Sequence, residues 1–190
     1  MDTTGRIYNG DLNTVSTYAA NRYISANLYP DAGIGVFRHR GHILGFGTRS
    51  MEVFYNAGNE GIGSPLRRRD ELTRKIGLIN ARAAVSIEDS FAFVGATDPT
   101  GLAVYLMKEF LPERISTPEI EAQLALAVGT STISMSACKI VGRTFLMVVA
   151  GTTTFVYCIE DGLWHQWSSQ TILWHRMAGI PSGTSFVTYA

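Results

Sequence analysis

The chain has 190 residues, of which 46% are hydrophobic and 17% are charged, and its 16 Lys and Arg balance its 16 Asp and Glu. This composition predicts a folded globular protein, because disordered chains carry fewer apolar and more charged residues. Zero net charge excludes a global field that would draw the whole chain to nucleic acid or to an anionic membrane. The longest apolar runs, such as 144–150, are too short to span a bilayer, and the first residues lack a secretory signal pattern, so we expect synthesis in the cytoplasm.

Three segments along the chain share one pattern: a turn, an apolar strand, a hairpin turn with Gly or Thr, and a second strand that ends in aromatic residues. They cover residues 41–56, 89–107 and 142–167, and Asp98, Pro99 and Gly101 supply the hairpin turn of the second. Aligning the tyrosines of the second strands places them 50 and 52 residues apart: Tyr55, Tyr105 and Tyr157. We interpret this spacing as a repeat of about fifty residues.

Each hairpin is flanked by further strand candidates. One precedes each hairpin, at 34–38, 82–87 and 132–140, and a following strand is clearest at 163–169. Four short strands per fifty residues are typical of a β-propeller blade, whereas a sandwich or barrel, the alternative fold, would not echo at that period. We predict an all-β, propeller-like region over 1–190, a partial propeller or a fragment of one, because three blades do not close a ring. It has antiparallel four-stranded blades and an incomplete last unit, divided at about 34–75, 82–116, 132–169 and 170–190.

One helix is predicted to interrupt the strands at about 117–128. Thr117 suits the N-cap, Pro118 suits the first helical position, and Glu119 and Glu121 lie where the positive end of the helix dipole favours acids. The apolar residues fall on one face: Ile120, Leu124 and Ala127. We expect this helix to cap or link two blades.

The segment 56–76 is the longest polar stretch and concentrates positive charge. Five cations fall within nine positions, beside only Asp70 and Glu71: Arg67, Arg68, Arg69, Arg74 and Lys75. One hypothesis is contact with phosphate groups of nucleic acid. The alternative is a solvated face, or a protein contact made through Arg–carboxylate pairs.

The cysteines and histidines do not form a metal-binding pattern. Cys138 and Cys158 fall in apolar, strand-like runs, where free thiols behave as small hydrophobic residues, so we predict neither a disulfide nor a zinc site. The four histidines lack the spacing of metal ligands, and two of them follow a Trp, which favours aromatic packing beside a polar neighbour: His39, His42, His165 and His175.

No motif for nucleophilic catalysis or for a phosphate-binding loop is present, so we predict no catalytic residue and no cofactor. Paired carboxylates are the remaining enzymatic route, because propellers can carry glycosidases. The candidates are Glu52, which is unusual because it lies on a strand, and three acids in turns, Asp89, Asp98 and Asp161.

Aromatic residues recur on the predicted strands. They could form a platform that stacks on sugars, but their repetition favours packing between blades. The residues concerned are Phe54, Tyr55, Phe91, Phe93, Tyr105, Phe155 and Tyr157.

Five segments in a fixed order resemble one family, the packaged-DNA stabilisation proteins, or tail hub and nozzle propellers, of short-tailed bacteriophages. The segments are 25–37, 41–59, 82–86, 114–124 and 152–167. The resemblance implies a non-catalytic virion protein of the tail or neck, a hub, nozzle or plug. It would contact portal, adaptor and tail proteins, assemble as a ring of copies, help to close the portal channel and retain packaged DNA.

The family supplies no motif for the cationic segment. Contact of its five cations with a neighbouring subunit or with DNA is our own hypothesis. Two other functions stay open at this point: a carbohydrate- or protein-binding propeller unrelated to virions, and a glycosidase-like propeller enzyme.

Overall fold

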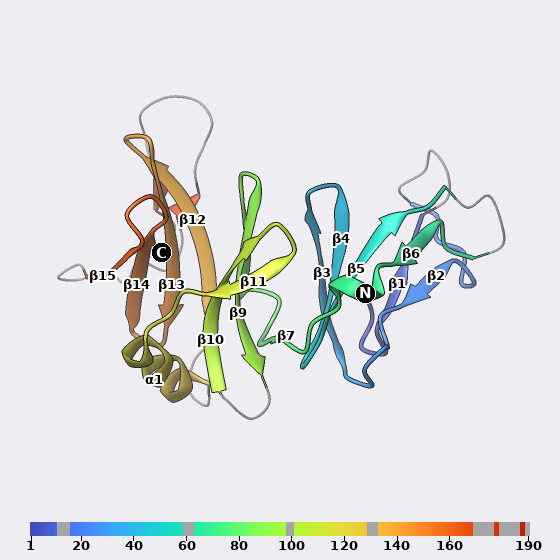
Figure 1. Cartoon of the computed structure of the whole chain (residues 1–190), viewed down its shortest axis with the longest axis horizontal. Coiled ribbons are helices and arrows are strands. Elements are labelled where there is room, and N and C mark those ends of the chain that lie inside the picture. The colour runs from blue at the N-terminus through green and yellow to red at the C-terminus, as the bar shows by residue number, and fades with distance from the viewer. Residues whose placement is uncertain are drawn as a thin grey trace.

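A computed structural model describes most of the chain as three antiparallel sheets that follow one another along its long axis (Figure 1). Within the described residues, no helix has the length and apolar character needed to cross a membrane. The described residues are 1–10, 16–58, 63–97, 101–128 and 133–168, with the strand positions 177–178 and 187–188.

Each sheet is built from strands that pair in chain order, because short turns join each strand to its neighbour. The first sheet contains β3 (Gly33–His39), β4 (His42–Gly47), β5 (Met51–Asn56) and β6 (Leu66–Arg68). The second contains β8 (Ala84–Ile87), β9 (Ser90–Thr97), β10 (Gly101–Lys108) and β11 (Leu111–Arg114), and β7 (Gly77–Leu78) pairs with the same edge of β9 as β8. The third contains β12 (Ser134–Ile140), β13 (Arg143–Ala150), β14 (Thr153–Cys158) and β15 (Leu163–Trp167).

Smaller elements complete the architecture. Two strand pairs lie at the ends of the described chain, and two helical segments follow the outer strands β6 and β11. They are β1 (Arg6–Tyr8) with β2 (Tyr23–Ser25), β16 (Met177–Ala178) with β17 (Val187–Thr188), the 3-10 turn η1 (Asp70–Leu72) and the helix α1 (Pro118–Ala127). The prediction of an all-β chain with four-stranded antiparallel sheets and one short helix is confirmed.

The core lies between the faces of successive sheets. Phe46 of the first sheet is 4.9 Å from the Phe93 ring of the second, and Phe93 stacks on Tyr105 at 5.3 Å. On the other side of the second sheet, Val104 belongs to the same buried cluster as Leu146 of the third. The second sheet is therefore apolar on both faces, which the run of hydrophobic residues in β9 and β10 reflects.

The tyrosine alignment is wrong by one residue in the first sheet. The last strand pair before the hairpin turn is Thr97–Gly101 in the second sheet and Ala150–Thr153 in the third. Tyr105 and Tyr157 each lie four residues after the second member of that pair, and both pack toward the preceding sheet. In the first sheet the Gly47 N–H donates to the Ser50 carbonyl at 2.9 Å, so the fourth residue after Ser50 is Phe54. Tyr55 lies on the opposite face. The two aromatic residues are adjacent in sequence, and only the hairpin register distinguishes them.

The strands β1 and β2 pack on the first sheet in the position of a preceding sheet. Ile7 and Ala26 form a buried cluster with Phe54, on the face that points away from the second sheet. The approach is close at Gly45, where a Cβ would lie 3.1 Å from Ile7 Cδ1 and 3.2 Å from the Phe54 ring. A larger residue at this position would push the strand pair off the sheet.

The helix α1 joins the second sheet to the third, as expected of a linking helix, and contacts β10 and β13. Its N-cap is Thr117, whose side chain makes no capping hydrogen bond, and the predicted apolar face is buried. The Ser116 hydroxyl donates to Glu121 at 2.6 Å, and Glu121 also pairs with Arg114. These contacts fasten the start of the helix to the outer strand of the second sheet.

Some predictions fall outside the described residues. They concern the hairpin residues Asp98 and Pro99, the histidine His175, and most of the unit predicted at 170–190.

Left-handed backbone conformations form the turns between the first two strands of each sheet. The turn of the third sheet has φ of 50° at Val141 and 77° at Gly142, and the turn of the first has 46° at Arg40 and 74° at Gly41. Two positive φ values give the twist that joins antiparallel strands tightly. A β-branched residue is poorly suited to such a position, and Val141 is 96% exposed, so no burial offsets the strain.

We expect Val141→Asn to raise the free energy of unfolding by about 1 kcal/mol, because Asn followed by Gly suits this turn and relieves the strain. Urea denaturation measures the change. Leu163→Asn is the matched control, since it replaces an exposed apolar residue on a strand without positive φ. A Val141→Asn protein no more stable than the wild type would contradict the interpretation.

The hairpin register also predicts different costs for two adjacent aromatic residues. Phe54→Ala should lower the free energy of unfolding by about 3–5 kcal/mol, because it leaves a cavity under β1 and β2. Tyr55→Ala should cost about 1 kcal/mol, because Tyr55 is only half-buried. Equal losses in thermal or chemical denaturation would show that the two faces are not distinguished in this way.

Candidate functional site

The cationic residues predicted as a contact site lie together at the outer edge of the first sheet. We call residues 67–75 the arginine segment; it comprises the end of β6, the turn η1 and the residues that follow. Arg67 is exposed on β6, where it faces Tyr55 of β5 across the strand pair. The edge position follows from the topology, because β6 is the last strand of its sheet.

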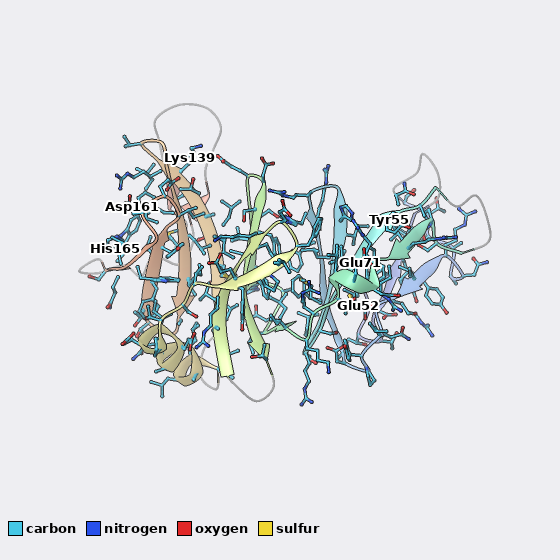
Figure 2. All side chains as sticks on the ribbon, in the orientation of Figure 1. Glu52, Tyr55, Glu71, Lys139, Asp161 and His165 are labelled. Atoms are coloured by element: carbon cyan, nitrogen blue, oxygen red, sulfur yellow. The ribbon has the colours of Figure 1, made fainter. Side chains whose placement is uncertain are left out.

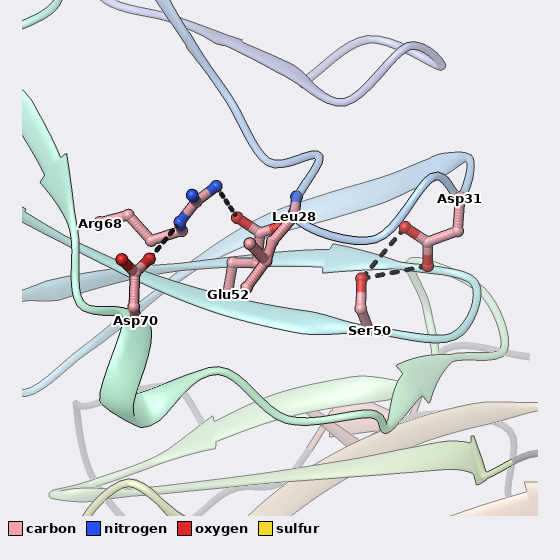
Figure 3. A network of polar contacts seen from close by, with 6 residues as sticks. All are labelled: Leu28, Asp31, Ser50, Glu52, Arg68 and Asp70. Atoms are coloured by element: carbon pink, nitrogen blue, oxygen red, sulfur yellow. Dashed lines mark hydrogen bonds and ion pairs between the residues drawn. The ribbon is translucent and has the colours of Figure 1, made fainter.

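Arg68 is held by two carboxylates, one of which is buried (Figure 3). Its Nη1 lies 3.1 Å from Oε2 of Glu52, and its Nε lies 2.6 Å from Oδ1 of Asp70. Glu52 is fully buried on β5, and its Oε1 accepts a hydrogen bond of 2.8 Å from the Leu28 N–H. The unusual strand glutamate of the sequence is thus a structural anchor.

Burial raises the pKa of Glu52, while the hydrogen bonds from Leu28 and Arg68 act in the opposite direction and do not fully offset it. Nearby, the Ser50 hydroxyl donates to both carboxylate oxygens of Asp31 at 3.0 and 3.1 Å (Figure 3). The segment between β2 and β3 is therefore fastened to β5 at two points, one at Leu28 and one at Asp31.

Arg69 is held in a second, more exposed arrangement. Its Nε donates to Oε1 of Glu71 at 2.9 Å, and its Nη1 lies 3.5 Å from Nε2 of His42. The Nδ1 of His42 lies 3.0 Å from the Arg40 carbonyl, so Nδ1 carries the proton and Nε2 is free to accept. The imidazole also packs edge-on against Phe110 of the second sheet at 4.8 Å.

The remaining cations also contact their own chain. Arg74 Nη1 donates to the carbonyls of Glu71 and Thr73 at 2.9 and 2.8 Å. Lys75 Nζ lies 5.2 Å from the centre of the Tyr29 ring, a cation–π contact. Four of the five cations therefore have contacts within the chain, whereas Arg67 is exposed and has no such contact among the described residues.

Side chains around Arg68 and Arg69 line an open pocket of about 410 Å³ at the edge of the first sheet. The labels in Figure 2 place Tyr55 and Glu71 close together on this part of the molecule. The pocket is lined by His42, Tyr55, Arg68, Arg69 and Glu71. The two arginines were predicted from the sequence as contact residues. His42 was not, because it reaches them only through the pairing of β4, β5 and β6. Leu28 contributes through its backbone N–H, so its residue type in the sequence could not indicate its contact with Glu52.

Of the carboxylates considered for catalysis, Glu52 is buried and engaged in structural contacts. Glu52 is in the first sheet, Asp89 is in the turn between β8 and β9, and Asp161 is in the third sheet, where it pairs with Arg143. Figure 2 shows Asp161 near the left end of the molecule and Glu52 to the right of its centre, with the second sheet between them. A glycosidase needs two carboxylates within about 10 Å that can reach a substrate, and the Glu52 carboxylate is instead bound by Arg68 and by the Leu28 N–H.

Of the described histidines, His39 and His42 are partners across the β3–β4 hairpin and both pack against Phe110, whereas His165 lies on β15. His39 is 4% exposed and its Nε2 bonds to the Glu109 carbonyl; burial lowers its pKa. His165 is exposed between two half-buried tryptophans, as the aromatic-packing interpretation predicted. Within the described ranges, no group of three or more His, Cys, Asp or Glu residues could hold a metal ion.

Both cysteines are buried free thiols, as predicted: Cys138 and Cys158. Burial raises the pKa of the Cys138 thiol, which disfavours the reactive thiolate.

Comparison with known proteins gives one family. A family model for phage stabilisation proteins, described as the β-propeller of bacteriophage P22 Gp10, matches residues 1–176. The match covers all three sheets, both helical segments and the arginine segment. No curated protein matches the sequence.

The buried Glu52 predicts a pH dependence of stability. Because its pKa is raised on folding, the folded protein holds the Glu52 proton more tightly than the unfolded chain. The stability of the wild type relative to Glu52→Gln should therefore fall as pH rises above the ordinary glutamate value of 4.5 and level off above the raised pKa. Urea denaturation between pH 4.5 and 8 measures this difference.

The exposed Glu88, which pairs with Lys139, provides the matched control Glu88→Gln for the loss of one negative charge. A difference between wild type and Glu52→Gln that stays constant, or grows with pH, would contradict the burial of a carboxylate at this position.

Proposed function

The chain belongs to the phage stabilisation family of the bacteriophage P22 Gp10 β-propeller, and from this premise we propose that it is a component of the tail or neck of the phage particle. Membership makes the chain a bacteriophage structural protein with a β-propeller fold and confirms the resemblance noted in the sequence. The single observation that carries the proposal is the family match over residues 1–176, which spans the three sheets.

The proposed role is that of a hub, nozzle or plug that helps to close the portal channel and to retain packaged DNA. In that role the chain contacts portal, adaptor and tail proteins and copies of itself arranged as a ring. Broad sheet faces buried against one another support a rigid structural role, because such packing resists deformation. The pairing of Glu52 with Arg68 and of Asp161 with Arg143 supports a role without catalysis by these carboxylates.

The division into blades is part of the same proposal. The units at about 34–75, 82–116 and 132–169 each contain four strands of one sheet, and the fifth strand of the second sheet, β7, precedes its unit. The strands β16 and β17 begin the next unit, because β16 contacts β12 in the same way that β12 contacts β8. Both contacts join the first strands of successive units, as expected around a propeller axis.

The arginine segment is proposed as a contact surface toward a neighbouring subunit or toward DNA. Its outer members, Arg67 and Lys75, are exposed, whereas Arg68 is fixed to the buried Glu52. The segment thus combines a rigid base with accessible positive charge, which suits binding to an acidic protein surface or to phosphates.

DNA retention tests the proposed role directly. Particles assembled without this chain should lose their genome to added nuclease, whereas particles completed with the wild-type chain should protect it. The measurement is the fraction of packaged DNA that survives nuclease treatment. Equal protection with and without the chain, in particles of equal DNA content at the start, would exclude a role in retention.

Arg67→Ala tests the contact surface within the same assay, with Arg82→Ala as a control for loss of an exposed arginine in the turn before β8. We expect only Arg67→Ala to reduce assembly or DNA protection. Intact assembly and retention with alanine at all five cationic positions would remove the arginine segment from the proposal.

A further inference from the structure

The two guanidinium groups in the pocket of the first sheet are fixed on one side and open on the other. Each Nε donates to a carboxylate two residues along the chain, Asp70 for Arg68 and Glu71 for Arg69. Each Nη1 has a second contact, with Glu52 or with His42. Among the described residues, neither Nη2 has a protein acceptor.

The other lining residues add hydrogen-bonding capacity at the same opening. The Tyr55 hydroxyl can donate a hydrogen bond and has no partner within the described part of the chain. His42 is oriented by its bond to the Arg40 carbonyl and by its packing against Phe110. These groups come from three strands and one turn, so the sheet fixes their relative positions.

We infer that this pocket binds a phosphate group through Arg68, Arg69 and Tyr55. The donors of Arg68, Arg69 and Tyr55 line one opening at the sheet edge, and guanidinium groups bind the several acceptor oxygens of a phosphate with defined geometry. The arginines lose little conformational freedom on binding, because their Nε contacts already hold them. The volume of about 410 Å³ and the open mouth admit either a free phosphate or one phosphate of a nucleic-acid backbone.

Glu71 sets the strength of the site. Its carboxylate lines the pocket beside Arg69 and repels an incoming anion. Asp70 and Glu52 further neutralise Arg68, so the site should bind weakly and depend strongly on salt. Because the arginines attract the anion and Glu71 repels it, substitutions of Arg69 and Glu71 should change the phosphate affinity in opposite directions. Simple loss of structure would lower the affinity in both variants.

The inference does not rest on the proposed function, since binding of inorganic phosphate requires neither a virion nor DNA. If nucleic acid is the source of the phosphate, the pocket would supply one of the DNA contacts proposed for the arginine segment. The two sources are distinguished by using inorganic phosphate and a duplex of mixed sequence as separate probes.

The experiment titrates the full chain with inorganic phosphate, followed by calorimetry and by NMR signals of the Arg69 and Tyr55 side chains. Arg69→Gln should weaken binding about tenfold, because it removes a charged donor. Glu71→Gln should strengthen binding about two- to fivefold, because it removes an exposed like charge. Tyr55→Phe should weaken binding about threefold while keeping the ring.

Arg143→Gln is the matched control, because Arg143 is a carboxylate-paired arginine outside the pocket, and it should leave phosphate affinity unchanged. Equal losses in Arg69→Gln and Arg143→Gln would overturn the inference, as would weaker binding in Glu71→Gln or the absence of phosphate-dependent shifts at Arg69. Circular dichroism of each variant confirms that the sheets remain folded.

The DNA arm uses the same variants. Duplex binding that falls with salt and with Arg69→Gln supports a backbone phosphate as ligand, and phosphate binding without duplex binding supports a free phosphate. An acidic peptide that binds in the pocket while phosphate does not would overturn the inference. Failure here leaves the nuclease-protection result unaffected, so the two proposals fail separately.

Discussion

Face-to-face packing of successive sheets is the interaction on which the rest of the structure depends. The second sheet buries one face against Phe46 of the first and the other against Leu146 of the third. Once both faces are buried, each residue on a strand has a fixed neighbour, and a shift of one position would exchange the two faces. The outer edges of the sheets stay accessible, and the arginine segment lies on one of them.

Glu52 is the buried carboxylate among the described residues of this largely apolar packing. In the first sheet, the face opposite the second sheet is covered by β1, β2 and the segment that follows them, and Glu52 is buried there. Its pairing with Arg68 connects the core to the exposed edge, so the position of the pocket depends on a buried charge. A buried ion pair adds little net stability, but it fixes the orientation of the arginine.

The repeated strands could be predicted from the sequence, because apolar runs and turn residues are local signals. The hairpin register could not be fixed at Phe54 and Tyr55, since both are aromatic and only the hydrogen bond at Gly47 assigns their faces. For the arginine segment the cations were evident, but their partners were not. Arg68 reaches Glu52 sixteen residues away and Arg69 approaches His42 twenty-seven residues away, through strand pairing that the local sequence does not encode.

The central claim is that this chain is a propeller component of the phage tail or neck. An electron-density map of the intact particle at side-chain resolution tests it most directly. We expect copies of the chain in a ring around the tail axis, with the three sheets in chain order and Phe54, Tyr105 and Tyr157 at equivalent places. A tail and neck without this chain, or three sheets that do not follow one another around an axis, would contradict the claim.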